Sequence, residues 1–346
     1  VHHKLIKILK DKGVDSQDVR IIEKLYWRQT ATACINGKST EICKIQRGVR
    51  QGCILSPLLF NLYSDRIFKE ALHNLEWGVK VNGILINTIR YADDTIILSD
   101  DMNGLQHLLN AIDTVGREFG LNINCSKTKY MVFSRLAHQD SRLYVDGHII
   151  QRVPSFKYLG CRITEQLDPD KEIKCRIEIA RTTFLKMRSF FCNETLQLQL
   201  RKRMIKCYSW SVLLYGVEAW TLKISTINRL EAFEMWLHRR ILKIPWTAML
   251  TNVAVLKRAN ATRELLDNIK YRKMAYFGHV VRGDRYNILQ LIMMGKIEGR
   301  RGIGRKQASW LKNIREWTGI KKAEHLFRIA RDRDSFAMLI ANVKGT

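Results

Sequence analysis

The stretch "RYADDTIILS", residues 90–99, places two adjacent carboxylates, Asp93 and Asp94, inside an otherwise apolar run. Aspartate is a poor strand former, and an unpartnered buried carboxylate is costly. Residues 83–99 are rich in β-forming side chains on both sides of the pair. The pattern therefore predicts a β-hairpin with Asp93 and Asp94 at its turn, presented from the end of a sheet into a cleft.

Paired carboxylates of this kind supply the hard oxygen ligands that Mg²⁺ prefers. Two metal ions about 3.5–4 Å apart can hold both the attacking and the leaving oxygen of an in-line phosphoryl transfer. An Asp-Asp pair is also typical of an ordinary hairpin turn, so the pair alone leaves both interpretations open.

Three further blocks decide between these interpretations. In chain order they are "QRGVRQGCILSPLLFNLY" (46–63), "GLNINCSKTKYMVFS" (120–134) and "FKYLGCRIT" (156–164). Together with "YADD" at 91–94, their order and spacing resemble the palm of a reverse transcriptase of the non-LTR (LINE-like) retrotransposon branch. The resemblance covers about residues 1–165. Later segments are more weakly similar to those that trail the polymerase in such elements: "LLYGVEAW" (213–220), "FGHVVR" (277–282) and "GRKQASWLKNI" (304–314).

The resemblance implies an RNA-directed DNA polymerase that uses an RNA template, a DNA primer and Mg²⁺ or Mn²⁺. By the same resemblance Asp93 would bind both metal ions and Asp94 would assist. Tyr91 would pack near the primer end, and "FKYLG" would lie close to the primer grip. Tyr91 can also be an ordinary packing residue.

Two more segments receive roles from the resemblance. Gln51 and Gly52 would shape the nucleotide and template pocket, where glycine lets a backbone come close. Lys127 would neutralise, or donate a proton to, the departing pyrophosphate. Gln51 can also be a turn residue and Lys127 a solvated charge, although the neighbouring blocks favour the roles that the resemblance implies.

The resemblance also implies a third carboxylate, in a block like D-Y-S-K-A-F-D ahead of a helix that begins like "VHHKLI" (1–6). We expect residues 1–346 to lack this carboxylate and to be inactive by themselves. Asp65 is a poor substitute, because it lies in the helix after the Gln51-Gly52 loop and can pair with Lys69 at i+4.

Charge separates the two halves of the chain. The net charge is +26, yet residues 1–150 carry 20 Lys/Arg against 16 Asp/Glu and residues 151–346 carry 39 against 17. A field of this strength attracts polyanions, and nucleic acid is favoured over a merely solvated surface. The best candidates for phosphate contacts are Arg300, Arg301, Arg305 and Lys306. For the tryptophans of the second half, core packing is favoured over base stacking.

The pattern predicts an α+β fold with three parts: a partial palm (1–165), a thumb-like helical domain (166–250) and a basic helical C-terminal region (251–346). Helices are expected near 3–12, 15–29, 56–75, 103–119, 170–191, 196–214, 226–243, 263–281, 308–317 and 323–341. Ser56 is expected to cap the third helix, and residues 126–134 are expected to form a strand.

Other features concern the compartment and rival functions. The sequence has no apolar run of about 18 residues and no signal peptide, so we expect an intracellular protein, nuclear or cytoplasmic, with no membrane partner. The eight scattered cysteines favour free thiols. A catalytically inactive remnant that only binds nucleic acid is the main alternative. An RNA-dependent RNA polymerase is disfavoured, because such enzymes usually have glycine where Ala92 stands.

Overall fold

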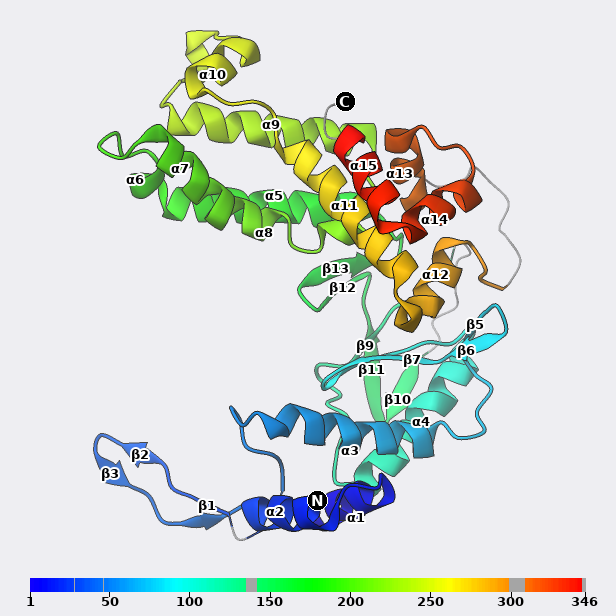
Figure 1. Cartoon of the computed structure of the whole chain (residues 1–346). Helices are drawn as coiled ribbons and strands as arrows, with labels where there is room; N and C mark the ends of the chain where they lie inside the picture. The colour runs from blue at the N-terminus through cyan, green and yellow to red at the C-terminus, as the bar shows by residue number, and fades with distance from the viewer. Residues whose placement is uncertain (28, 46, 135–141, 299–308, 344–346) are drawn as a thin grey trace. The chain divides into compact units, whose positions relative to one another are not determined.

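The computed structural model describes residues 1–27, 29–45, 47–134, 142–298 and 309–343, and its fold is α+β, as predicted (Figure 1). The chain divides into two compact units, one of residues 1–130 with 136–153 and the other of residues 131–135 with 154–346. The hairpin at 155–164 thus packs with the helices. The predicted domain boundaries at 165 and 250 stay predictions.

Three helices of the first unit pack together: α1 (His2–Asp11), α2 (Ser16–Tyr26) and α3 (Leu55–Ala71). Asp15 caps α2, because its carboxylate accepts the N–H of Gln17 at 2.7 Å. Apolar residues at helical spacing bury one stripe of each helix against the others. Their shared core includes Leu5, Ile8, Leu9, Val19, Tyr26, Leu59, Tyr63 and Ile67.

Short strands join α2 to α3. β1 (Thr30–Ala31) pairs with β4 (Cys43–Lys44), and β2 (Cys34–Ile35) pairs with β3 (Lys38–Ser39) around the turn Asn36-Gly37. Both turn residues have positive φ, 51° and 79°, which suits an Asn-Gly hairpin turn.

The rest of the first unit combines hairpins with one long helix, α4 (Met102–Glu118). Two hairpins precede α4. A three-stranded sheet follows it, in which β11 lies between an antiparallel β10 and a parallel β9. The strands are β5 (Val79–Val81), β6 (Ile84–Ile86), β7 (Thr88–Tyr91), β8 (Asp94–Ile97), β9 (Lys129–Tyr130), β10 (Leu143–Val145) and β11 (His148–Arg152).

Two local expectations in this unit are wrong. Ser56 does not cap α3: it lies inside the first turn, and its hydroxyl is 3.1 Å from the buried hydroxyl of Tyr26. Of the strand expected at 126–134, only Lys129–Tyr130 is extended and paired. Asn124 explains the second difference, because it accepts hydrogen bonds from the Ser126 hydroxyl and the Lys127 N–H and so closes a turn there.

The second unit begins with a hairpin of β12 (Ser155–Tyr158) and β13 (Cys161–Thr164) and is helical afterwards. One core lies among its earlier helices, around Phe184, Leu213 and Leu230, and another around Phe277 and Phe336. The helical segments are α5 (Pro169–Lys186), α6 (Arg188–Phe191), α7 (Leu198–Ile205), η1 (Lys206–Trp210), α8 (Ser211–Leu213), η2 (Val217–Ala219), α9 (Ile224–Ile241), η3 (Trp246–Ala248), α10 (Asn252–Ala259), α11 (Leu265–Arg282), η4 (Asp284–Tyr286), α12 (Asn287–Met293), α13 (Trp310–Thr318), α14 (Ala323–Arg331) and α15 (Arg333–Val343).

The periodicity found most of these helices but missed the short α10 and α12. The helix expected at 323–341 is two helices, α14 and α15. Asp332 separates them with an extended backbone, and its carboxylate accepts from the Asp334 N–H and the Ser335 hydroxyl. Within the described ranges, no helix is both long enough and apolar enough to cross a membrane. All eight cysteines are free thiols.

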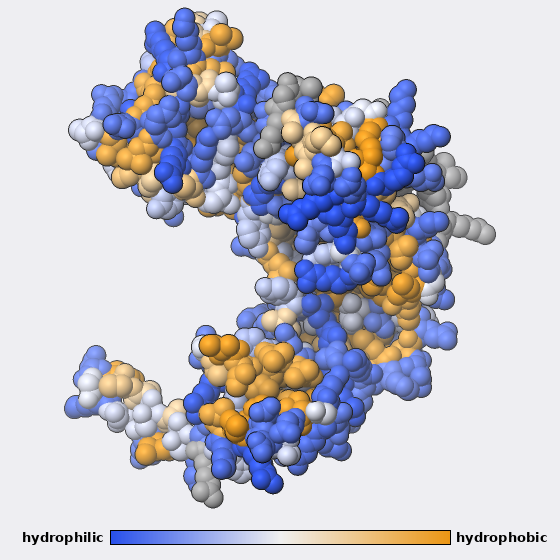
Figure 2. All heavy atoms as spheres, viewed as in Figure 1, coloured by the Kyte–Doolittle hydropathy of each residue, from blue (hydrophilic) through white to orange (hydrophobic). Residues whose placement is uncertain are grey.

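One apolar surface stands out on the first unit. Ile54, the residue before α3, is 95 % exposed, and Leu58 on the first turns of α3 is also exposed. Hydrophobic side chains gather over this end of the helix (Figure 2). Exposed apolar clusters of this kind mark surfaces that bind another molecule.

Candidate metal-binding hairpin and nucleic-acid surfaces

The two carboxylates lie at the end of the β7–β8 hairpin. Tyr91 pairs with Asp94 and Ile89 with Ile96, so the connecting loop is Ala92-Asp93. The predicted hairpin is therefore confirmed, with Asp93 in the loop and Asp94 as the first residue of β8. Ala92 has a φ of 54°, in the left-handed region that favours glycine, so this tight loop holds a strained residue.

The hairpin has a covered face and an open face. On the covered face, Arg90 donates to Asp65 of α3 at 3.1 Å and lies 4.8 Å from the ring centroid of Phe68. Because side chains alternate along a strand, Tyr91 and Asp94 lie on the opposite face with Ile89. Tyr91 is 65 % exposed and Ile89 is exposed too. The fold therefore directs Asp94 and Tyr91 away from the α3 side.

Both carboxylates are free to take a ligand. Among the residues that the structure describes, no side-chain hydrogen bond or ion pair engages Asp93 or Asp94, and both residues are exposed. The same part of the chain contains no group of three or more His, Cys, Asp or Glu placed to hold one metal ion. The hairpin thus offers oxygen ligands of the right kind, but fewer than a tightly held Mg²⁺ needs.

Asp65 is the nearest acidic candidate on α3, and it is already neutralised. Its carboxylate lies 2.9 Å from Lys69, 3.1 Å from Arg90 and 3.9 Å from Lys12. The hydrogen bond from Lys69 is the main cause that lowers the pKa of Asp65. The expected i,i+4 pairing with Lys69 is confirmed, and these three cations leave Asp65 unsuited to a metal.

The other predicted site residues of this unit lie in separate loops. Gln51 and Gly52 form an exposed turn ahead of α3, where Gly52 has a φ of 84°. Lys127 is exposed in the Asn124-centred turn before β9. Within the described residues, no hydrogen bond or ion pair links either loop to the Asp93-Asp94 hairpin.

Comparison with known proteins identifies this unit. Residues 1–163 match the family "Reverse transcriptase (RNA-dependent DNA polymerase)". These residues are a reverse transcriptase segment. The match covers the Gln51-Gly52 turn, the Asp93-Asp94 hairpin, Lys127 and nearly the whole of the β12–β13 hairpin.

Curated relatives of the reverse transcriptase segment are mobile-element proteins. The RNA-directed DNA polymerase from mobile element jockey of Drosophila melanogaster is 24 % identical over 234 residues, which are 65 % of this chain and 25 % of that protein. The Pol polyprotein from the retrotransposable element R2DM of the same species is 30 % identical over 172 residues, 47 % of this chain and 16 % of that protein. The resemblance to a LINE-like, non-LTR reverse transcriptase that the sequence predicted is thus confirmed.

The relatives differ in length. The chain spans about a quarter of the jockey polymerase. A transposon-derived protein of Caenorhabditis elegans, by contrast, is 25 % identical over 276 residues, which are 76 % of this chain and 98 % of that protein. An alignment of that length continues from the reverse transcriptase segment into the helical unit.

Sequence reasoning missed three residues that hold the β12–β13 hairpin. Its turn, Leu159-Gly160, is fixed from the helices that follow: the hydroxyl of Tyr215 donates to Leu159 O at 2.7 Å, and the guanidinium of Arg176 donates to Gly160 O. Arg176 also pairs with Glu172 at 2.6 Å, and Glu172 accepts the backbone N–H of Arg162 at 2.8 Å.

The two motifs "FKYLG" and "LLYGVEAW" supply the contacts of this clamp. A Cβ on Gly160 would meet the Tyr215 ring at 3.1 Å, and one on Gly216 would meet Cys161 Sγ at 2.7 Å. A side chain at either position would collide with its neighbour, so both positions require glycine. No local pattern in the sequence signals this contact, because Tyr215 and Leu159 lie 56 residues apart.

The tryptophans of the helical unit follow the core-packing prediction with one exception. Trp210 and Trp220 are buried, and Trp236, Trp310 and Trp317 are partly buried against the two cores. Trp246 is 81 % exposed. The predicted phosphate contacts Arg300, Arg301, Arg305 and Lys306 lie outside the described residues and stay predictions.

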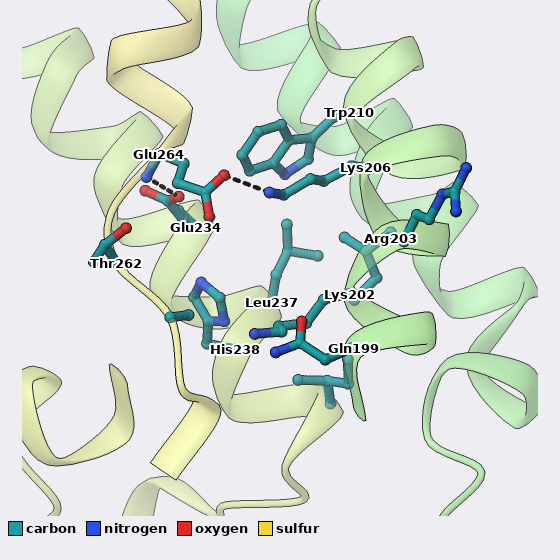
Figure 3. A pocket seen from close by; sticks show the side chains of 13 residues that line it. Gln199, Lys202, Arg203, Lys206, Trp210, Glu234, Leu237, His238, Thr262 and Glu264 are labelled. Atoms are coloured by element: carbon teal, nitrogen blue, oxygen red, sulfur yellow. Dashed lines mark hydrogen bonds and ion pairs between the residues drawn. The ribbon is translucent and has the colours of Figure 1, made fainter. Parts of the chain in front are cut away.

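A cavity of about 210 Å³ lies between α7, α9 and the segment before α11 (Figure 3). Three of its polar side chains, Lys202, Lys206 and Glu264, bind protein groups: Lys206 pairs with Glu264, and Lys202 donates to the carbonyls of Ala259 and Asn260. Glu234 accepts the first N–H groups of α11, and burial raises its pKa. These bonds hold the three elements together, so the cavity is a structural feature with no predicted site residue in it.

Proposed function

We propose that this chain supplies the metal-binding end of a polymerase that copies RNA into DNA for a non-LTR retroelement. The observation that carries the proposal is the β7–β8 hairpin, which exposes two unengaged carboxylates within the reverse transcriptase segment. Asp93 and Asp94 bind Mg²⁺, or Mn²⁺, through their carboxylate oxygens. Bound metal ions would activate the primer hydroxyl and stabilise the leaving pyrophosphate.

The open face of the hairpin supports a position for the primer. Tyr91 lies beside Asp94 on that face, so its exposed ring can pack against the primer end while Asp94 assists Asp93. Gln51 and Gly52 leave the backbone of their turn accessible to the incoming nucleotide and the template. Lys127 is an exposed cation that neutralises the departing pyrophosphate.

A third carboxylate is needed to orient the metal ions. Asp65 is neutralised by three cations, and the described residues contain no other acidic group close enough to form a three-ligand cluster. We propose that the third ligand comes from a part of the polymerase outside the residues that the structure describes. A loosely held ion positions the reacting groups poorly, and positioning is most of the catalysis in phosphoryl transfer.

The shortage of ligands also favours a second candidate function, a nucleic-acid-binding remnant without catalysis. The net charge of +26 is sufficient for either candidate. In both, the basic second half binds the duplex or single strand, with Arg300, Arg301, Arg305 and Lys306 as phosphate contacts. The two candidates differ in the role of Asp93. A polymerase needs this carboxylate for primer extension, whereas a nucleic-acid-binding remnant does not.

Primer extension on an RNA template by the polymerase that contains this segment separates the candidates. Asp93→Asn removes a ligand charge and should abolish Mg²⁺-dependent extension, and Asp94→Asn should be milder. Asp100→Asn is the matched control, because Asp100 is an exposed aspartate three residues after the end of β8. Full activity in the Asp93 variant would exclude the metal role of the hairpin, and binding without any extension would favour the remnant.

A further inference from the structure

Trp246 lies in the loop between α9 and α10 and projects into solvent. It is 81 % exposed, while the other described tryptophans of this unit pack into or against a core. Met249 and Val253, at 86 % and 76 %, are exposed in the same segment. A large aromatic side chain left in water is uncommon unless it has a partner to bind.

The loop that carries Trp246 is held in place by Arg239 of α9. The Arg239 guanidinium donates to Leu250 O at 2.7 Å and to Asn252 Oδ1 at 3.1 Å, and its centre lies 5.6 Å from the Trp246 ring centroid. Thr251 then caps α10 by accepting the Ala254 N–H at 3.3 Å. These contacts fix the loop on the C-terminal side of Trp246, and on the N-terminal side the Ile244 N–H donates to Arg239 O at 2.9 Å. The indole is therefore presented by a built structure.

The surroundings of Trp246 are cationic. Residues 235–263 contain six Lys/Arg and no Asp/Glu. Lys243 pairs with Glu194, Arg263 pairs with Glu231, and Arg239 is engaged with the loop as described. Among the described residues, the exposed Lys257 and Arg258 of α10 have no ion-pair partner. Hydrophilic side chains mix with hydrophobic ones over α10 (Figure 2). An exposed aromatic ring within a positive field is the arrangement that binds single-stranded nucleic acid, because cations hold the phosphates and bases stack on the ring.

We propose that Trp246 is a stacking platform for an unpaired base of a single-stranded nucleic acid, held ready by Arg239. The inference deepens the proposed nucleic-acid binding of the second half and rests on it. The Arg239 guanidinium lies over the ring, and the exposed remainder of the indole offers a flat face to a planar base. Stacking of this type is tolerant of sequence, since every base has a π-face.

The test measures how the full 346-residue chain binds a fluorescently labelled oligouridine, by anisotropy over a series of salt concentrations. Trp246→Ala should weaken binding about five-fold to 100-fold, and Trp246→Phe should retain part of the affinity. The slope of log affinity against log salt should stay unchanged in both variants, because no charge is removed. Arg239→Gln should weaken binding and lower that slope as well.

Ile224→Ala is the matched control, because Ile224 is about as exposed as Trp246, at 79 %. The cation next to Ile224, Lys223, is already paired with Asp168 and Asp170. The Ile224→Ala chain should bind the oligouridine like the unchanged chain. Circular dichroism and thermal unfolding check that each variant folds.

Three results would overturn the inference. Unchanged oligouridine affinity in Trp246→Ala would exclude the stacking role while leaving nucleic-acid binding by the chain intact. No oligouridine binding by the unchanged chain would exclude both the inference and the proposed binding function. A Trp246-dependent affinity for phosphatidylserine–phosphatidylcholine vesicles, with unchanged oligouridine binding, would assign the loop to a lipid surface.

Discussion

At the scale of single residues, Lys273 is the most unusual group in the helical unit. Its side chain is fully buried and donates to Trp220 O at 2.6 Å and to Asn313 Oδ1 at 2.9 Å, with the Trp310 ring centroid at 4.8 Å. No acidic residue pairs with it among the described residues. Burial lowers the pKa of Lys273 to about 7, although the two acceptors and the ring favour the charged form.

The lowered pKa of Lys273 makes the free energy of unfolding depend on pH. Between pH 7 and about 10.5 the unfolded chain keeps a proton on this amine that the folded chain releases, so stability rises with pH in that window. Within that window the free energy of unfolding rises by roughly 1.4 kcal/mol for each pH unit. Lys273→Met should remove this rise. Denaturant unfolding at several pH values measures this dependence, and parallel pH curves for the two chains would contradict the lowered pKa of Lys273.

Backbone conformation gives a second prediction at this scale. Gly52 and Ala92 both have positive φ, 84° and 54°. Gly52→Ala should lower the free energy of unfolding by about 1 kcal/mol, because an L side chain disfavours that region. Ala92→Gly should not lower it, since the same strain is relieved at the hairpin. Thermal unfolding of the two variants tests the opposite signs, and a stabilising Gly52→Ala would be inconsistent with the turn.

At the scale of elements, the clamp on the β12–β13 hairpin decides where "FKYLG" lies. Arg176 and Glu172 are buried and bonded to each other and to the hairpin backbone. Removing one partner of such a buried pair leaves an uncompensated charge. Arg176→Met should therefore cost about 3–5 kcal/mol and speed hydrogen exchange at residues 156–164.

Arg66→Met is the matched control for the clamp, because Arg66 and Glu70 are also an i,i+4 pair but are exposed. It should cost less than about 1 kcal/mol. Equal costs for the two variants would show that the Arg176 pair does not act as a clamp.

The elements also show what the sequence could predict. Periodic apolar residues located α1, α4, α9 and α11, because each helix buries one continuous stripe. The turn before β9 and the break at Asp332 depend on single side chains that bond the backbone, and no periodicity reports such bonds. The Asp93-Asp94 hairpin was predictable from local sequence.

Contacts distant in sequence could not be predicted. Tyr215 reaches Leu159 across 56 residues, and Lys273 reaches Trp220 across 53. The exposure of Trp246 was missed for the same reason: its neighbours Ile244 and Leu250 are apolar, as around the buried tryptophans, and only tertiary packing distinguishes them.

At the scale of the whole molecule, activity should require more metal ligands than the described residues offer. We predict that RNA-templated primer extension by the 346-residue chain stays at background with millimolar Mg²⁺ or Mn²⁺, because two carboxylates hold the ions loosely. Template-dependent synthesis would contradict this prediction. Asp65→Asn would then be the first variant to examine.

The uneven charge gives a prediction for nucleic-acid binding by the whole chain. Affinity for duplex DNA should fall steeply with salt, with a slope of about −0.9 for each phosphate neutralised. Replacing Arg300, Arg301, Arg305 and Lys306 by alanine should reduce the slope by about one for each phosphate that the variant no longer neutralises. A salt-independent affinity would show that the +26 charge is only a solvated surface.

The most direct measurement is the Mn²⁺-induced broadening of backbone amide resonances in the 346-residue chain. If Asp93 and Asp94 are the metal ligands, broadening should be strongest at residues 91–95 and should disappear in Asp93→Asn, while Asp100→Asn keeps it. Broadening centred elsewhere, or unchanged in the Asp93 variant, would contradict a metal site at this hairpin.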